Sequence, residues 1–317
     1  MKHSIICVDA SYGDKIYGNA WVLTEGEPKA NVIICHGMAE HSKRYDAFAN
    51  FLCEQNFDVY AVDHVGHGLN VSKKLDTKYK YGMWPENGFD VAIDQLVELV
   101  NFIKAKSDKP ILLFGHSMGS FVAQGFYQRH SELVKGVVFC GSSANTGLYK
   151  MSMKLAATMR VFKSKKKRDQ VCPILVNSGN STFNKGLKPF ADGYDSVNKW
   201  ISINEDNVKK YDKDPECGFP CSFNFYYALF KGQQEIFKKK NLQSIKNKCN
   251  IFIISGELDP VGGYGENVKK LKDFYLMGQE NVDLKLYPGV RHEILNEDIK
   301  EEVYKDVLSF FNKCLSK

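Results

Sequence analysis

The sequence predicts an α/β fold: a mostly parallel sheet with an N-terminal antiparallel hairpin and an inserted, mainly helical cap. From residue 31 onward, short apolar runs alternate with amphipathic helical patterns, which is typical of successive βα units. The alternation stops near Ser142 and resumes at Asn250 with another apolar run. An insertion between two strands of one sheet explains this interruption.

The spacing of apolar residues justifies each element in turn. Two alternating runs, SIICVDA and KIYGNAWVL, predict the hairpin, and the continuous apolar runs after them predict buried strands. The predicted strands are NVIICHG, FDVYAVD, PILLFGHS, VKGVVFCG, NIFIISGELD and VDLKLYPG. Spacings of three and four predict helices over residues 44–55, 89–106, 118–130, 266–276 and 297–315.

The interruption divides the chain into a core of residues 1–141 and 251–317 and a cap of residues 142–250. The cap has helical patches at Met151–Phe162 and Phe223–Lys240 and no clear series of strands. It contains 20 Lys and Arg against 9 Asp and Glu, a net charge of +11, so the rest of the chain has −5. This charge suits peripheral contact with an anionic membrane, although a solvated basic face needs no partner.

Composition argues against several classes of protein. No window approaches 18 consecutive apolar residues, so a membrane span is not expected, and the N-terminal stretch is too polar for a secretory signal. The nine cysteines are odd in number and form no CxxC pair. They favour reduced thiols in a cytoplasmic protein over disulfides or a zinc site. No nucleic-acid partner is expected, and the sequence leaves the oligomeric state open.

One serine lies where an α/β sheet places its reactive groups, at the carboxyl end of a strand. The pentapeptide GHSMG, residues 115–119, matches G-x-S-x-G between an apolar run and a helical pattern. That context predicts a tight strand-to-helix elbow that exposes Ser117 as a nucleophile. Glycines suit the elbow because a Cβ atom there would clash with the neighbouring strand and helix.

A serine nucleophile needs a base, and a carboxylate that orients the base. Only two of the eight histidines follow Ser117, and His130 lies about 20 Å away along the predicted helix. His292, in the loop after VDLKLYPG, is therefore the candidate base. Asp259 closes the apolar run NIFIISGELD and is the candidate acid, with Glu257 as its rival.

Two backbone N–H groups should stabilise the oxyanion that forms when the serine attacks. Met118 directly follows the nucleophile and supplies one of them. Met38 supplies the other, because it follows the His36–Gly37 pair in the loop after the strand NVIIC. This chemistry needs neither a metal nor an organic cofactor.

Several ordered segments resemble one family. HGMAEHSKRY resembles the HG-x-x-EHS-x-RY segment of monoacylglycerol lipase-like and lysophospholipase-like α/β-hydrolases, which are serine aminopeptidase S33-type hydrolases. The resemblance continues through DHVGHG, GHSMGS, DPECGF, SGELDPVG and YPGVRHEILNE. It implies the α/β-hydrolase fold, the catalytic triad Ser117, Asp259 and His292, and the donors Met38 and Met118. Val65 departs from the family, which often has Arg there; the change affects a loop salt bridge more than the chemistry.

The resemblance also implies that Glu40, His41, Arg44 and Tyr45 brace the loop of Met38. The hypothesis is a serine esterase that cleaves small-molecule esters, above all monoacyl lipids such as monoacylglycerols or lysophospholipids, through an acyl-enzyme. The alternatives are a general short-chain carboxylesterase, a transacylase, and a non-catalytic binding or scaffold member of the fold.

Three other patterns stay open. His41 and Asp46 fit an H-x4-D acyltransferase pattern, but two residues at a fixed spacing often occur by chance. His64 and His67 suggest a metal, although no third ligand is evident. The aromatic stripe over residues 223–230 predicts either the wall of an acyl channel or ordinary cap core.

Overall fold

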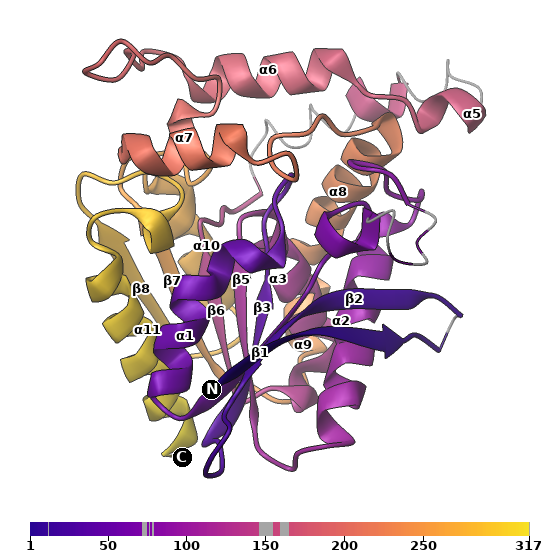
Figure 1. Cartoon of the computed structure of the whole chain (residues 1–317), viewed down its shortest axis with the longest axis vertical. Helices are drawn as coiled ribbons and strands as arrows, with labels where there is room; N and C mark the ends of the chain where they lie inside the picture. The colour runs from indigo at the N-terminus through magenta and orange to yellow at the C-terminus, as the bar shows by residue number, and fades with distance from the viewer. Residues whose placement is uncertain are drawn as a thin grey trace.

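A computed structural model gives the fold and describes residues 1–11, 13–71, 75, 77, 79–145, 155–158 and 165–316 (Figure 1). Within these residues, eight strands form one sheet in the order β1-β2-β4-β3-β5-β6-β7-β8. The strands are β1 Lys2–Asp9, β2 Lys15–Val22, β3 Ala30–Cys35, β4 Phe57–Val62, β5 Ile111–His116, β6 Gly136–Cys140, β7 Asn250–Gly256 and β8 Val282–Tyr287.

The pairing of the strands confirms the predicted architecture. β1 and β2 form the antiparallel hairpin, and β2 also runs antiparallel to β4. From β4 onward every neighbouring pair is parallel. Parallel strands place their carboxyl ends on one edge of the sheet, so the loops that follow them converge there.

Both faces of the sheet are covered at its centre, which is why β3, β5, β6 and β7 are buried along their whole length. In β3, Ile33 and Cys35 pack into one core, whereas Val32 and Ile34 pack into the other. Helices α1 and α11 cover the second of these faces, and α2, α3, α8 and α10 cover the first. The helices are α1 Asp46–Glu54, α2 Gly88–Lys104, α3 Met118–His130, α5 Lys165–Arg168, α6 Pro173–Phe183, α7 Glu205–Lys213, α8 Phe223–Ile236, α9 Lys239–Gln243, α10 Glu266–Leu276 and α11 Lys300–Leu315.

The helix boundaries differ from the predictions where short 3-10 helices intervene. α1 begins two residues late because Ser42–Tyr45 forms a 3-10 helix. α11 begins at Lys300 because Glu297 precedes it in extended conformation, and the Glu297 carboxylate accepts backbone N–H groups of Ile203 and Arg291 instead. α10 has the predicted bounds.

The insertion, residues 142–250, enters after β6 and leaves into β7, and these two strands are parallel neighbours. Figure 1 shows α6 and α7 above one end of the sheet. α8 instead packs against α2 and α3 and belongs to the same core as they do; a Cβ atom on Gly232 would lie 2.1 Å from the Phe89 ring. The predicted patch at Met151–Phe162 lies outside the described residues except for 155–158.

The predicted helix over Phe223–Lys240 is two helices, α8 and α9, separated at Phe237 and Lys238. None of the helices in the described ranges is both long and apolar enough to cross a membrane.

Candidate active site

Ser117 occupies a strained elbow between β5 and α3. Its φ of 51° and ψ of −122° place it in the left-handed half of the backbone map, which costs a non-glycine residue about 1–3 kcal/mol. The flanking glycines permit this turn. A Cβ atom on Gly119 would lie 2.2 Å from the carbonyl oxygen of Cys35, and one on Gly115 would lie 2.6 Å from the carbonyl oxygen of Gly119.

Asp259 and His292 lie together at the carboxyl end of the sheet. His292 Nδ1 donates to Asp259 Oδ2 at 2.9 Å, and both side chains are buried. The carboxylate also accepts the Ser255 hydroxyl at 3.0 Å and the Val261 N–H at 2.8 Å. Burial alone would raise the pKa of Asp259, but the charge and hydrogen bond of His292 outweigh it and hold the pKa below its usual value.

An ionised Asp259 fixes which nitrogen of His292 holds the proton. Because the carboxylate can only accept, Nδ1 is the donor and the neutral ring presents its lone pair at Nε2. Nε2 is buried and has no hydrogen-bond partner among the described residues. This is the state of a base that is ready to accept a proton.

The structure places Ser117 and His292 on the wall of one cavity of about 260 Å³. No hydrogen bond joins the Ser117 hydroxyl to His292 Nε2 among the bonds of the described residues. Such bonds are often long before substrate binds and tighten in the complex, so the missing bond does not exclude the pair.

The loop with Met38 lies directly against the elbow. A Cβ atom on Gly37 would lie 3.2 Å from the Cβ atom of Ser117. Met38 and Met118 both line the cavity beside Ser117. Met118 is the first residue of α3, so its N–H has no carbonyl acceptor one turn earlier in the helix and is available to an anion.

A buried ionic network fixes this loop. Glu40 Oε1 accepts the Gly37 N–H at 2.6 Å and the Tyr45 hydroxyl at 2.9 Å, and Glu40 Oε2 accepts Arg44 at 2.7 Å. The Arg44 guanidinium also binds Glu293 in bidentate fashion, at 2.6 and 2.7 Å. The contacts of Glu40, Arg44 and Tyr45 are those of the brace that the resemblance implied.

Two members of this network went unnoticed in the sequence. His116 has one ring nitrogen 3.3 Å from Glu40 Oε1 and the other 3.3 Å from the backbone carbonyl of His292. Glu293 directly follows the candidate base and connects it to Arg44. The only feature of the sequence that could have singled them out is their position: His116 directly precedes the candidate nucleophile, and Glu293 directly follows the candidate base.

The two other histidine patterns in the sequence do not form the sites that they suggested. His41 contacts Asp214 at 3.0 Å, while Asp46 accepts the Trp21 indole N–H, so the H-x4-D pair is not joined. His67 lies beside His64, and both of its ring nitrogens are hydrogen-bonded to backbone groups. Burial lowers the pKa of His67 to about 3, so this histidine is an uncharged residue of the protein interior.

Residues 142–250 contribute most of the apolar side chains that line the cavity, and the rest of the chain contributes Glu40, Ser117 and His292. Of the aromatic stripe, Tyr226, Leu229 and Phe230 line the cavity, whereas Phe223 and Phe225 pack into the core. Tyr226 and Leu229 also pack into that core, so the stripe is core that partly faces the cavity, and its role as an acyl channel stays a prediction. Trp200 also lines the cavity, and its ring lies 5.1 Å from the ring of His292.

Comparison with known proteins identifies the family. Residues 26–299 match the family described as serine aminopeptidase, S33. The chain belongs to this family. It is 24% identical over 307 residues to a monoacylglycerol lipase of Mycolicibacterium smegmatis, covering 94% of this chain and 93% of that protein. It is 34% identical to the monoglyceride lipase of Rattus norvegicus over 112 residues, which cover 35% of this chain and 34% of the relative.

Solved structures agree with this assignment to the S33 family. A thermostable carboxyl esterase from Bacillus coagulans, solved in complex with glycerol, superposes with a TM-score of 0.87 at 26% identity over 99% of both chains. The predicted α/β-hydrolase fold, with its eight-stranded, mostly parallel sheet, is therefore confirmed.

Proposed function

We propose that this member of the S33 family is a serine hydrolase that cleaves carboxylic esters of monoacyl lipids through an acyl-enzyme. The observation that supports it best is the position of Ser117, at a strained elbow on the same cavity wall as the buried Asp259–His292 pair. The names of its relatives, monoacylglycerol lipase and carboxyl esterase, support the ester as the reacting group.

In the proposed mechanism, the Ser117 hydroxyl attacks the ester carbonyl while His292 Nε2 accepts its proton. Asp259 stabilises the resulting imidazolium. The carbonyl electrons move to oxygen, where the N–H groups of Met38 and Met118 donate to the oxyanion. When the tetrahedral intermediate collapses, the C–O bond to the alcohol breaks and His292 returns its proton to the leaving oxygen.

Water then repeats the sequence on the acyl-enzyme. His292 accepts a proton from the water molecule as its oxygen attacks the acyl carbonyl, and the same two N–H groups hold the second oxyanion. The bond to Ser117 Oγ breaks, the serine regains its proton from His292, and the carboxylic acid leaves. No metal or organic cofactor takes part in this scheme.

A single acyl chain suits the cavity. Its lining includes the apolar side chains of Tyr226, Leu229 and Phe230 on α8 and of Leu175 and Phe183 on α6, which would contact an alkyl chain. The alcohol must leave beside His292, which protonates it, so the alcohol side faces Trp200 and the acyl side faces α8. Apolar burial contributes about 0.8 kcal/mol per methylene, which favours longer acyl chains over short ones.

We further propose that residues 142–250 are inserted into a core of residues 1–141 and 251–317 and that their α6 and α7 act as a cap, whereas α8 packs against α2 and α3. This insertion has a net charge of +11 and large exposed apolar side chains. These are Leu155, Val171, Ile174, Val197 and Ile203. Basic and apolar groups together favour peripheral contact with an anionic lipid surface from the cytoplasm, where the substrate would be collected.

The function is tested by initial rates on a monoacylglycerol, a lysophospholipid and p-nitrophenyl butyrate, measured side by side for the wild type and Ser117→Ala. The proposal expects hydrolysis of a monoacyl lipid that depends on Ser117. A preference for butyrate would indicate a short-chain carboxylesterase, and acyl transfer to added glycerol in place of hydrolysis would indicate a transacylase. Turnover of none of these esters would favour a scaffold protein.

Membrane contact has a separate test. Cosedimentation with vesicles of anionic phospholipid is expected to exceed that with neutral phosphatidylcholine vesicles and to weaken as salt is added, because salt screens charges. Equal binding to both would remove the electrostatic part of the proposal.

A further inference from the structure

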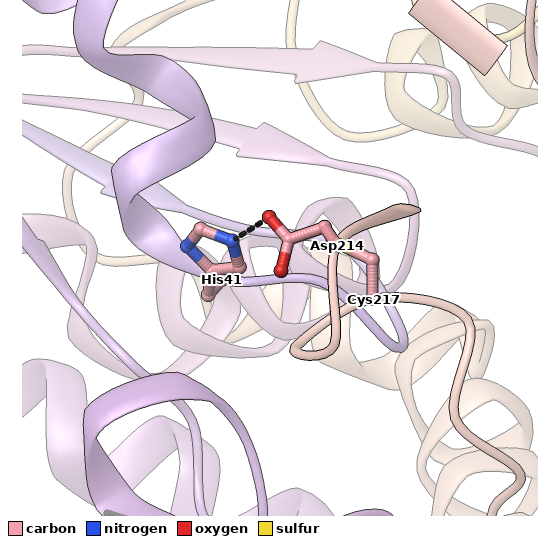
Figure 2. A group of neighbouring side chains, drawn as sticks. All are labelled: His41, Asp214 and Cys217. Carbon is pink, nitrogen blue, oxygen red and sulfur yellow. Dashed lines mark hydrogen bonds and ion pairs between the residues drawn. The ribbon is translucent and has the colours of Figure 1, made fainter. Parts of the chain in front are cut away.

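Three side chains with metal-binding atoms meet where the insertion touches the loop of Met38. His41 Nε2 lies 3.0 Å from Asp214 Oδ2, and the Sγ atom of Cys217 completes a group whose donor atoms all lie within 4.8 Å of one another (Figure 2). We propose that His41, Asp214 and Cys217 form a binding site for a thiophilic divalent cation such as Zn²⁺.

The donor set is the one that zinc prefers. Imidazole nitrogen, thiolate sulfur and carboxylate oxygen bind Zn²⁺ at about 2.0–2.3 Å in tetrahedral geometry, often with water as the fourth ligand. Those bond lengths put neighbouring donors about 3.3–3.8 Å apart. The His41–Asp214 distance is already close to this, so the cation needs a small outward shift of the carboxylate and an approach of the thiol.

The backbone holds the two insertion ligands on one turn. The Cys217 N–H donates to the Asp214 carbonyl at 3.0 Å, and the Glu216 N–H donates to Asp214 Oδ1 at 2.8 Å. The carboxylate is thereby oriented with Oδ2 toward His41. The hydrogen bond between His41 and Asp214 explains why those two side chains meet. It does not explain why the Cys217 thiol lies beside them.

Charges of both signs surround the thiol. The Arg44 guanidinium has the largest single charge effect on Cys217, and the carboxylates of Glu40, Asp214 and Glu293 oppose it. Binding of Zn²⁺ requires the thiolate form of the cysteine.

The site also has an entry path and a mechanical consequence. His41 and Cys217 are buried, but the side chain of Asp214 is 32% exposed, which leaves one side open to water. Beside the site, the Ala39 carbonyl accepts the Gly218 N–H at 2.9 Å and the Tyr211 hydroxyl at 2.8 Å. A bound cation would thus cross-link the insertion to the loop that holds Met38.

Titration of the full chain with Co²⁺ tests the site directly, because a cobalt–thiolate bond produces a charge-transfer band in the near ultraviolet. The expected result is one such band per chain. It should disappear in Cys217→Ser, and Co²⁺ should bind at least about tenfold more weakly to Asp214→Asn. Cys221→Ser is the matched control: this buried thiol lies four positions further on and outside the group, so the band should remain.

Two further readouts separate metal binding from folding. Zn²⁺ should raise the melting temperature of the wild type but not of Cys217→Ser, and both proteins should unfold cooperatively without added metal. The proposal is overturned if folded wild-type protein gives no thiolate band, or if Cys217→Ser retains it. Neither spectrum nor melting requires turnover, so the outcome is independent of whether the ester hydrolase proposal holds.

Discussion

The Asp259 carboxylate and the His292 imidazole, 33 positions apart in the chain, are joined by a hydrogen bond of 2.9 Å in a buried site. The strand β7 ends just before the first residue, and the second lies in the loop after its parallel neighbour β8. Sheet topology alone thus brings the acid to the base. The bond defines the imidazole tautomer, and with it the direction of proton transfer.

Replacing Asp259 by Asn should reduce kcat/KM for an ester by about 10⁴-fold, because the amide reverses the tautomer of His292. Stopped-flow or steady-state hydrolysis of p-nitrophenyl butyrate measures the loss. Glu257→Gln is the control: this rival carboxylate is exposed and two residues away, so the variant should retain activity. A large loss of kcat/KM in Glu257→Gln together with full activity in Asp259→Asn would assign the role of the acid to Glu257.

Gly119→Ala should destabilise the fold by about 3 kcal/mol, because the new Cβ atom would meet the Cys35 carbonyl at 2.2 Å. Gly179→Ala provides the contrast. Gly179 lies in α6, and a methyl group added there would have no heavy atom within 4 Å, so alanine should stabilise by about 0.5–1 kcal/mol. Urea unfolding monitors both, and equal midpoints would refute the packing argument for the elbow.

The buried carboxylates should make the protein sensitive to acid. Burial alone would raise the pKa values of Glu40 and Glu293, but Arg44 and His116 together hold both below the ordinary value of 4.5, with His36 adding to the effect on Glu40. Groups with lowered folded pKa values contribute stability that is complete above about pH 4.5 and is lost as the pH falls through the folded values. The free energy of unfolding should therefore decline below that pH.

Glu293→Gln tests this account of acid sensitivity. At pH 7 the variant should lose about 3 kcal/mol, since Glu40 is then the one carboxylate among the described residues that pairs with Arg44, and the difference from wild type should shrink in acid. Urea titrations at pH 7 and in mild acid measure both effects. The exposed Glu266, replaced by Gln, should leave the urea midpoint unchanged at either pH. A pH-independent loss in Glu293→Gln would show that packing, and not charge, was removed.

Leu229→Trp should shift acyl-chain preference toward shorter esters, because the larger side chain fills the apolar wall on α8. Rates on long-chain monoacylglycerols are expected to fall about tenfold relative to p-nitrophenyl butyrate. Tyr227→Trp is the matched control on the same helix, where Tyr227 lies against Lys231 and outside the cavity lining. An unchanged chain-length profile in Leu229→Trp would place the acyl chain elsewhere.

The order of strands and helices outside the insertion could be predicted because each apolar run is local and each helix repeats its spacing. Residues 266–276 matched the helix for that reason. The start of α11 could not be predicted, since Glu297 uses its side chain to accept the backbone of Ile203, a contact across 94 positions. Likewise, α8 belongs to the core because Gly232 admits the Phe89 ring, which no local pattern reveals.

The same distinction holds for the candidate site. Ser117, Asp259 and His292 were predictable because each follows a strand, and the carboxyl ends of parallel strands meet. Their catalytic roles, and those of Met38 and Met118, stay predictions. The contacts of His116 with Glu40 and with the backbone of His292 span 76 and 176 positions and depend on side-chain geometry, so the sequence did not disclose them.

The central claim is that Ser117 is the nucleophile, and a fluorophosphonate probe tests it most directly. Peptide mapping by mass spectrometry of the labelled protein should place the adduct on Ser117. Labelling should vanish in Ser117→Ala and persist in Ser120→Ala, whose hydroxyl instead donates to the Ser117 carbonyl. An adduct on any other residue, or folded protein that takes up no probe, would contradict the proposed function.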